Sequence, residues 1–242
     1  HRHVDAALDA RPTLSDEQMR MVWRVCFSGA GVDVVEGVAG AGKTYALAAA
    51  NQAWTDSGNT VVGCALAAKA ARQLQTDADI PSLTIDRLLI DLDRPEQGGL
   101  ASNTVIVVDE AAMVGTRKLL RLLDHAEHAR AKVVLVGDPC QLPEIEAGGA
   151  FSGLRQRLDA SLLATNRRQQ SSWERTALAH LRVGDTDVAV DAYLDHGRVK
   201  IGSPGSDARE QMVDDWYNAR RSGTAVMLAS TRAESDALNQ RA

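Results

Sequence analysis

Short apolar runs alternate along the chain with longer stretches in which apolar residues recur every three or four positions. Four of the runs are rich in valine and show little polar alternation, which is typical of strands buried on both faces of a sheet. They lie at residues 32–36, 60–65, 104–108 and 132–136. The intervening stretches predict helices at residues 45–54, 67–75, 85–92 and 116–128. Strands that alternate with helices predict an α/β fold, with a parallel sheet and helices on both of its faces.

Another helix is expected before the first strand. Ser15 and Gln18 have the spacing of a capping box, and Leu14, Met21 and Val25 begin a helical apolar stripe. Residues 1–12 are polar and are not assigned to an element.

The character of the sequence changes after Gly149. Residues 150–196 are predicted to be mostly helical, and the remainder to contain strands at 198–201 and 225–229 and a helix at 207–221. This pattern predicts a first domain over residues 1–150 and an incomplete second α/β domain over residues 151–242. The chain has no initiating Met, and we expect it to be a piece of a longer protein.

The eight residues from Gly37 to Thr44 fit the phosphate-binding P-loop pattern, G-x-x-x-x-G-K-[ST]. A strand precedes them and a helix follows, so that backbone N–H groups and the helix N-terminus face an anion. Lys43 is expected to reach the β- and γ-phosphates, and the Thr44 hydroxyl to hold Mg²⁺. These flanks argue against the alternative, a glycine-rich turn without a ligand. The expected nucleotide-binding residues here are Gly37, Ala39, Gly40, Ala41, Gly42, Lys43, Thr44 and Tyr45.

Asp109 and Glu110 follow the wholly apolar run 104–108. Because parallel strands end at a common edge of the sheet, this pair is expected beside the P-loop. Asp109 is predicted to hold Mg²⁺ and Glu110 to activate the attacking water. The alternative is a pair that caps the N-terminus of a helix, which the upstream P-loop makes less favourable.

Two further segments are candidates for the same site. Gln141 follows the run 132–136 and can sense the γ-phosphate, although this segment taken by itself is better explained as a proline-bracketed turn. Arg167 and Arg168 can stabilise charge on a transferring phosphoryl group, or can be a solvated surface pair.

The overall composition limits the possible partners. The 242 residues carry a net charge of −5, so that a nucleic acid would need a local basic groove. No apolar run is long enough for a membrane span, and the N-terminus lacks the apolar core of a signal peptide. The three cysteines fit no metal-binding spacing, Cys64 and Cys140 are expected to be buried, and a reducing cytoplasm is the simplest localisation.

The motifs GVAGAGKT, VVDEAAM, GDPCQLP and TNRRQ, with Gln18 before them, resemble those of superfamily 1 DNA helicases of the RecD-like branch. The chain is most similar to the helicase region of conjugative relaxases of the TraI/TrwC (MobF) type. The resemblance runs from about residue 11 to the end. It implies a RecA-like ATPase domain followed by a second, incomplete one, with ATP and Mg²⁺ as cofactors. Single-stranded DNA is the implied partner, with conjugative secretion or relaxosome proteins as further candidates.

The resemblance also implies roles for individual residues. Gln18 matches the glutamine that reads adenine, and Arg168 matches the arginine finger better than Arg167 does. Thr84 matches a position that contacts single-stranded DNA. Lys69 lies in the place of the first DNA-contacting motif, where it and backbone groups would have to bind the phosphate. The chain departs from the family at Leu66-Ala67, where a Pro-Thr or Pro-Ser pair is usual, and at Asp86, where His is common.

Two later family motifs, one that couples to DNA and one with a second arginine finger, are not found in the sequence, so turnover by this chain alone is expected to be weak or absent. The leading hypothesis is therefore the ATPase core of a DNA translocase. The alternatives are a RecD-like repair helicase and a module that only binds single-stranded DNA.

Overall fold

The computed structural model describes residues 1–94, 99–141, 148–201 and 208–242. The chain divides into two compact units, His1–Arg175 and Thr176–Ala242. The predicted motif residues Leu142 and Pro143 lie outside the described residues.

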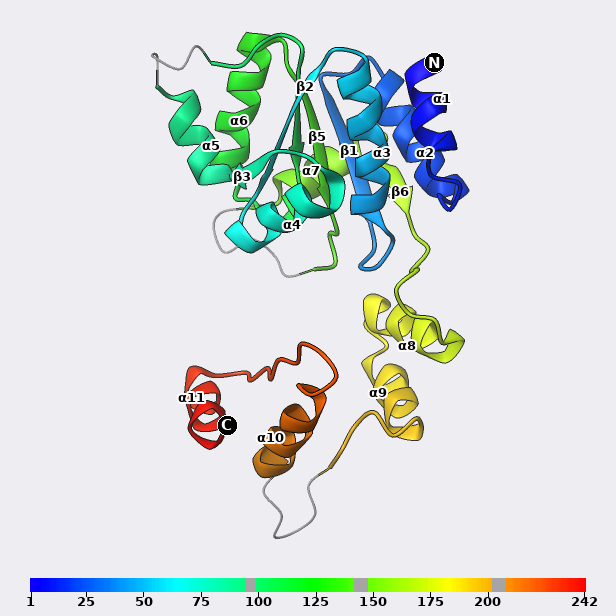
Figure 1. Ribbon diagram of the computed structural model, residues 1–242, viewed down its shortest axis with the longest axis vertical. Coiled ribbons are helices and arrows are strands. Elements are labelled where there is room, and N and C mark those ends of the chain that lie inside the picture. The colour runs from blue at the N-terminus through cyan, green and yellow to red at the C-terminus, as the bar shows by residue number, and fades with distance from the viewer. Residues whose placement is uncertain (95–98, 142–147, 202–207) are drawn as a thin grey trace. The chain divides into compact units, whose positions relative to one another are not determined.

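The first unit is built on a six-stranded sheet in which every paired strand is parallel (Figure 1). The strands, in the order β3-β2-β4-β5-β1-β6, confirm the predicted parallel sheet. Their bounds are β1 (Val32–Gly37), β2 (Thr60–Ala65), β3 (Ser82–Thr84), β4 (Thr104–Val108), β5 (Lys132–Gly137) and β6 (Ser161–Leu163).

The strand order brings the predicted motifs together. β5 lies between β4 and β1, with Val108 opposite Leu135 and Glu36 opposite Gly137. Because the strands are parallel, the segments that follow β1, β4 and β5 emerge at one edge of the sheet. The P-loop, Asp109-Glu110 and the turn containing Gln141 are these three segments.

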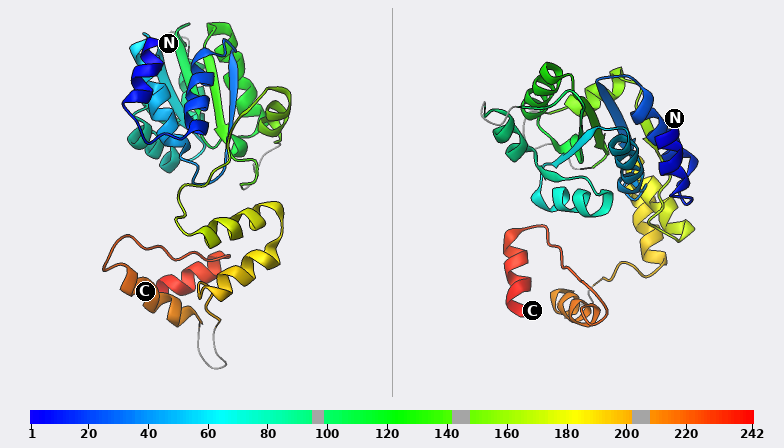
Figure 2. Two further views of the ribbon diagram at one scale, coloured as in Figure 1. Left: turned by 90° about the vertical axis from the view of Figure 1, so that its right-hand side faces the viewer. Right: turned by 45° about the horizontal axis from the view of Figure 1, so that its top comes forward.

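Among the described residues, seven α-helices lie wholly in the first unit, and helices cover both faces of the sheet (Figure 2). Their bounds are α1 (Arg2–Asp9), α2 (Asp16–Phe27), α3 (Lys43–Asp56), α4 (Ala68–Ala78), α5 (Ile85–Leu92), α6 (Thr116–Ala129) and α7 (Ala150–Arg157). The predicted capping box at Ser15 and Gln18 is present with both of its hydrogen bonds. Helix α1 lies where no element was assigned, and it buries Val4 and Ala7.

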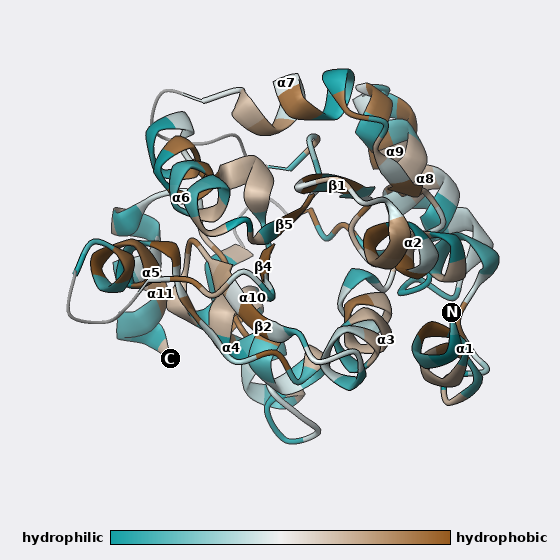
Figure 3. Ribbon diagram, turned by 90° about the horizontal axis from the view of Figure 1, so that it is seen from above, coloured by the Kyte–Doolittle hydropathy of each residue, from teal (hydrophilic) through white to brown (hydrophobic). Residues whose placement is uncertain are grey.

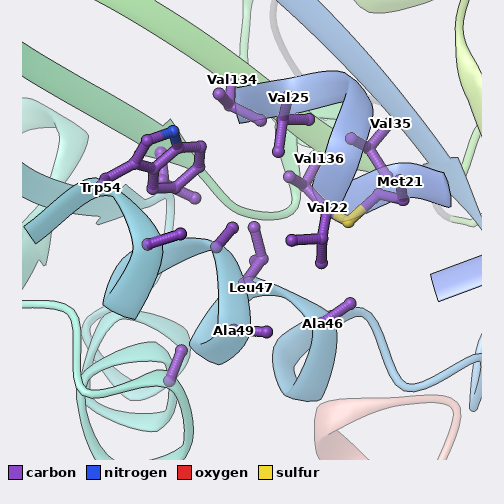
Figure 4. Packing of buried hydrophobic residues seen from close by; sticks show 14 of the residues in the cluster. Met21, Val22, Val25, Val35, Ala46, Leu47, Ala49, Trp54, Val134 and Val136 are labelled. Carbon is purple, nitrogen blue, oxygen red and sulfur yellow. The ribbon is translucent and has the colours of Figure 1, made fainter. Parts of the chain in front are cut away.

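Alternate residues of the strands face two separate hydrophobic cores. Val35, Val134 and Val136 belong to the first core, which also contains residues of α1–α4. Val34, Val133 and Leu135 belong to the second core, together with residues of α5–α7. Figure 4 shows the first core, where Met21 and Val22 of α2 and Leu47 of α3 meet the strands. In Figure 3 the apolar strands β4 and β5 run between the flanking helices. Each fully buried Val or Leu contributes about 1.5–3 kcal/mol to this packing.

The first unit runs past the expected boundary at residue 150 and ends at Arg175. Helix α7 packs Phe151 into the second core, and β6 pairs with β1, with Gly37 opposite Leu163. Residues 161–163 lie in the region that was predicted to be mostly helical, but they form a strand that completes the sheet of the first unit.

The second unit consists of helices over its described residues. They are α8 (Ser172–Val183), which begins just before the division, α9 (Thr186–Asp195), α10 (Ala208–Ala219) and α11 (Arg232–Arg241). The strands predicted at 198–201 and 225–229 do not form, and Val226 and Leu228 are 75% and 83% exposed. A strand needs a neighbour for its backbone hydrogen bonds, and the described part of this unit offers no sheet. The predicted second RecA-like domain is therefore not seen among the described residues of this unit.

Candidate nucleotide site

The P-loop joins β1 to α3, and its glycines are required by both conformation and space. Gly40 and Gly42 have φ of +79° and +73°, which L-residues with side chains rarely adopt. A Cβ atom at Gly42 would lie 2.4 Å from Nε2 of Gln18, and one at Gly40 would lie 2.8 Å from Cβ of Arg168. The loop therefore lies directly against α2 on one side and against the segment before α8 on the other.

Lys43 is the first residue of α3, and its side chain folds back over the loop. Its Nζ donates hydrogen bonds to the carbonyl oxygens of Gly37 at 2.8 Å and Val38 at 3.2 Å. A Cβ at Gly37 would lie 2.6 Å from Cδ of Lys43, so the glycine makes room for the lysine stem. Burial raises the pKa of the Asp109 and Glu110 carboxyl groups, and the charge of the Lys43 ammonium group partly opposes this rise at both. The structure thus brings together the cation and the two carboxylates that the sequence predicted.

Asp109 follows β4 and is fixed through its backbone and its carboxylate. Its N–H donates to the carbonyl of Cys64 in β2 at 2.9 Å, and its Oδ1 accepts from the N–H of Glu110 at 2.9 Å. Burial raises the pKa of Asp109, and this effect outweighs the opposing influence of Lys43. A carboxylate and the Thr44 hydroxyl form an oxygen-only donor set, which is the kind that Mg²⁺ prefers. Asp109, which follows β4, and Thr44, which lies in the first turn of α3, therefore have the chemistry expected of the predicted metal site.

Glu110 has a strained backbone. Its φ of +53° lies in the left-handed region, which costs an ordinary L-residue roughly 1–2 kcal/mol. Burial raises the pKa of its carboxyl group, and the neighbouring Asp109 charge raises it further. Strain and a raised pKa at one residue are features of functional sites. A pKa shifted toward neutrality suits a general base better than an ordinary one.

The turn after β5 contains one residue that the sequence singled out and one that it missed. Gln141 is exposed, and its N–H donates to the carbonyl of Asp138 at 3.1 Å. Asp138 is only 2% exposed, and its Oδ2 accepts a hydrogen bond from the N–H of Ala39 in the P-loop at 3.1 Å. The sequence signal that could have identified Asp138 is its place directly after a buried strand, like that of Asp109. The neighbouring Cys140, which was expected to be buried, is exposed, because it lies in this turn and no longer in the buried strand.

Gln18 is buried behind the P-loop, where its amide makes four hydrogen bonds. Its Nε2 donates to the carbonyls of Ala41 at 3.0 Å and Gly42 at 3.2 Å. Its Oε1 accepts from the N–H of Ser15 at 2.9 Å and from Nη1 of Arg167 at 3.3 Å. A glutamine amide has two donors and two acceptor positions, so all four are filled. Reading adenine with this side chain would require exchanging at least one of these bonds for a bond to the base.

The Thr165–Gln169 segment lies against the P-loop. The N–H of Arg167 donates to the carbonyl of Gly40 at 2.9 Å, and its guanidinium group contacts Gln18 and the carbonyl of Thr13. The carboxylate of Glu17 accepts from the N–H groups of Ala164 and Thr165, at 3.1 and 3.2 Å, and from the Thr165 hydroxyl at 3.1 Å. Glu17 is a second residue that the sequence did not identify.

The side chains of Arg167 and Arg168 differ in how firmly the protein holds them. Arg167 is tied down by these contacts, whereas the exposed side chain of Arg168 follows a backbone fixed by Asn166, whose Oδ1 accepts from the Arg168 N–H at 2.9 Å. This difference favours Arg168 as the arginine that can reach a ligand.

The remaining candidates lie near the site or apart from it. Tyr45 is exposed, and its hydroxyl lies 2.8 Å from that of Thr13. Lys69 is exposed in the first turn of α4, and Thr84 caps α5, its hydroxyl accepting from the N–H of Arg87 at 3.3 Å. These two residues follow β2 and end β3, so they lie at the same sheet edge but beyond the nucleotide-binding loops.

Comparison with known proteins gives a family match over most of the chain. A model of the AAA domain family matches residues 13–204. The probable conjugal transfer protein TraA of Sinorhizobium fredii is 36% identical over 242 residues, which are 99% of this chain and 22% of that protein.

Two helicases match over smaller parts. The RecBCD enzyme subunit RecD of Mycolicibacterium smegmatis is 39% identical over 45% of this chain, and the ATP-dependent RecD2 DNA helicase of Deinococcus radiodurans is 33% identical over 61%. These alignments cover 20% and 21% of the two helicases. The chain spans about a fifth of the length of the curated relatives that it matches.

Proposed function

The chain belongs to the AAA domain family, in the RecD-like branch of superfamily 1 helicases, and on that premise we propose that it is the ATP-hydrolysing motor core of a conjugative relaxase-helicase. The observation that carries this proposal is the convergence of three loops at one sheet edge. Lys43, Asp109 and Glu110 interact electrostatically there, and Asp138 binds the P-loop backbone.

In the proposed mechanism each residue has one task. The P-loop amides and Lys43 bind the phosphates of ATP, and Lys43 leaves the carbonyls of Gly37 and Val38 to do so. Thr44 and Asp109 would hold Mg²⁺, which would supply positive charge to the bound triphosphate. Glu110 orients a water molecule and takes its proton, and Gln141 senses the γ-phosphate.

Charge that develops on the transferring group needs a cation from outside the P-loop. Arg168 supplies it, because its backbone is anchored next to Gly40 while its side chain is exposed. Glu17 and Arg167 hold the segment that carries Arg168.

DNA is the second proposed ligand. Lys69 and Thr84 would contact the backbone of a single strand from the β2–β3 side of the sheet edge. Hydrolysis at the nucleotide site would alternate the grip on this strand and so move the motor along it. The parent protein would act in the cytoplasm with relaxosome or secretion proteins. None of the described helices is both long and apolar enough to cross a membrane.

A repair helicase of the RecD type is the second candidate. Resemblance to two RecD proteins favours it, but that resemblance covers 45% and 61% of the chain, against 99% for the conjugal transfer protein. A module that only binds DNA would have no need of Lys43, Asp109 and Glu110 in one cluster.

Replacing Lys43 by Ala tests the proposed activity. The variant should keep its fold and lose ATP hydrolysis in the parent protein by at least about 100-fold, the effect typical of removing one charge-stabilising group. Lys118→Ala is the matched control, since Lys118 pairs with Asp86 at 3.0 Å on the surface. Turnover in Lys43→Ala close to that of the control would refute the assignment.

A further inference from the structure

The carboxylate of Asp138 lies between two loops and accepts a backbone hydrogen bond from each. Oδ2 accepts from the N–H of Ala39 at 3.1 Å, and Oδ1 accepts from the N–H of Cys140 at 3.0 Å. The side chain is almost fully buried, at 2% exposure. A carboxylate buried to this extent is costly unless its oxygens are hydrogen-bonded, and here each oxygen has a fixed partner.

The two partners belong to the two loops whose spacing matters for a bound triphosphate. Ala39 is the third residue of the P-loop, and Cys140 directly precedes Gln141. The N–H of Gln141 donates to the backbone carbonyl of Asp138, so both ends of this short turn are attached to one residue. Glu36 and Gly137, where the two strands approach these loops, are paired in the sheet.

We propose that Asp138 is a positioning residue that ties the P-loop to the Gln141 turn, so that occupation of the γ-phosphate position is transmitted from one loop to the other. This inference rests on the proposed function of the nucleotide site. It assigns to Asp138 no contact with the nucleotide itself. Its effect comes from the distance that the carboxylate fixes between the N–H groups of Ala39 and Cys140.

Asp138→Asn changes this link with little change in volume. The amide keeps one acceptor oxygen, but its NH₂ group must then face an N–H donor of one loop. One hydrogen bond to a charged acceptor is lost, and a loss of this size corresponds to about a tenfold change in an equilibrium constant.

The readout is the preference for adenosine 5′-(γ-thio)triphosphate over ADP, measured as the ratio of the two dissociation constants by calorimetry on the 242-residue chain. We expect Asp138→Asn to reduce this ratio about tenfold. In a Gln141→Ala background the same substitution should change the ratio by less than about twofold, since coupled residues are not additive. An unchanged ratio, or equal weakening of both nucleotides, would overturn the proposal.

Asp33→Asn is the matched control. Asp33 is also buried, at 3% exposure, but it lies in β1 away from the loops and pairs with Lys132 at 2.6 Å. This variant should lower the unfolding temperature without changing the nucleotide preference. If it changes the preference as much as Asp138→Asn does, the effect reflects general destabilisation and the proposal fails.

A measurement on the wild-type protein covers the case in which Asp138→Asn does not fold. In nucleotide-free protein, hydrogen exchange of the Ala39 and Cys140 amides should be at least about tenfold slower than that of the Gly40 amide. Exchange of Ala39 as fast as that of Gly40 would overturn the proposal. Failure of the proposed function would give a different result. The protein without the Asp138 substitution would then show no nucleotide binding that Lys43→Ala weakens.

Discussion

Replacing Glu110 should stabilise the protein while abolishing hydrolysis, because this residue is held in an unfavourable state. Its backbone has φ of +53°, and burial together with the Asp109 charge raises the pKa of its carboxyl group. Both features destabilise the folded chain at neutral pH. Asn tolerates the left-handed conformation better than Glu does, so Glu110→Asn removes much of a backbone cost of roughly 1–2 kcal/mol. Glu110→Gln keeps the unfavourable left-handed backbone conformation and removes only the negative charge.

The expected order of unfolding temperatures at pH 7.5 is therefore Glu110→Asn above Glu110→Gln above wild type. A gain of about 1 kcal/mol corresponds to about 2–4 °C for a domain of this size. Arg130→Gly is a control for the backbone contribution, since Arg130 has φ of +56° at the end of α6, where no function is proposed. The Arg130→Gly variant should unfold at a higher temperature than the wild type and keep its rate of ATP turnover.

The pH dependence separates the charge from the backbone. A carboxyl group whose pKa is raised by folding stabilises the protein fully only below its unfolded pKa, near 4.5, and this stabilisation is lost as the pH rises through the folded pKa. The advantage of Glu110→Gln over wild type should therefore grow from pH 4 to pH 7. Scanning calorimetry measures the unfolding temperature of each variant, and an ATP turnover assay measures the loss of hydrolysis. A lower unfolding temperature for Glu110→Asn than for wild type would refute the assignment of strain to this residue.

Two further outcomes follow from the geometry. Gly42→Ala should lose nucleotide binding and unfold at a lower temperature, because the new Cβ would lie 2.4 Å from Nε2 of Gln18 at a φ of +73°, and unchanged nucleotide affinity would contradict this. A maleimide should label the exposed Cys140 first, since burial raises the pKa of Cys64 and of Cys26 to about 12. Peptide mapping of the first labelled residue checks this, and labelling of Cys64 before Cys140 would show that the sheet is wrongly assigned.

The sequence predicted the parts of the fold that local pattern determines. The run Val105–Val108 is apolar and could be a buried strand or a short buried helix, and its length and β-branched residues decided between them. The capping box at Ser15 gave the start of α2 correctly.

Elements that depend on distant partners were harder to predict. Ser161–Leu163 is a strand only because β1 offers an unpaired edge more than 100 residues earlier in the chain. Residues 225–229 have the composition of a strand, but the described part of their own unit offers no sheet to join, and Val226 and Leu228 remain exposed. Composition alone does not distinguish these two cases.

The site also has parts that local sequence pattern predicts and parts that depend on distant segments. The P-loop and Asp109-Glu110 are visible as short motifs at strand ends, so their convergence could be predicted from the parallel arrangement. The supporting contacts of Gln18, Glu17 and Asp138 join segments that are far apart in sequence. Only the folded chain brings these groups within hydrogen-bonding distance.

Single-strand-stimulated ATP hydrolysis tests the central claim most directly. In the parent protein, turnover by the wild type should rise when single-stranded DNA is added, and both the basal and the stimulated rates should be lost in Lys43→Ala. A wild-type rate that does not respond to DNA, or a stimulated rate that survives Lys43→Ala, would contradict the assignment of this nucleotide site to a DNA motor.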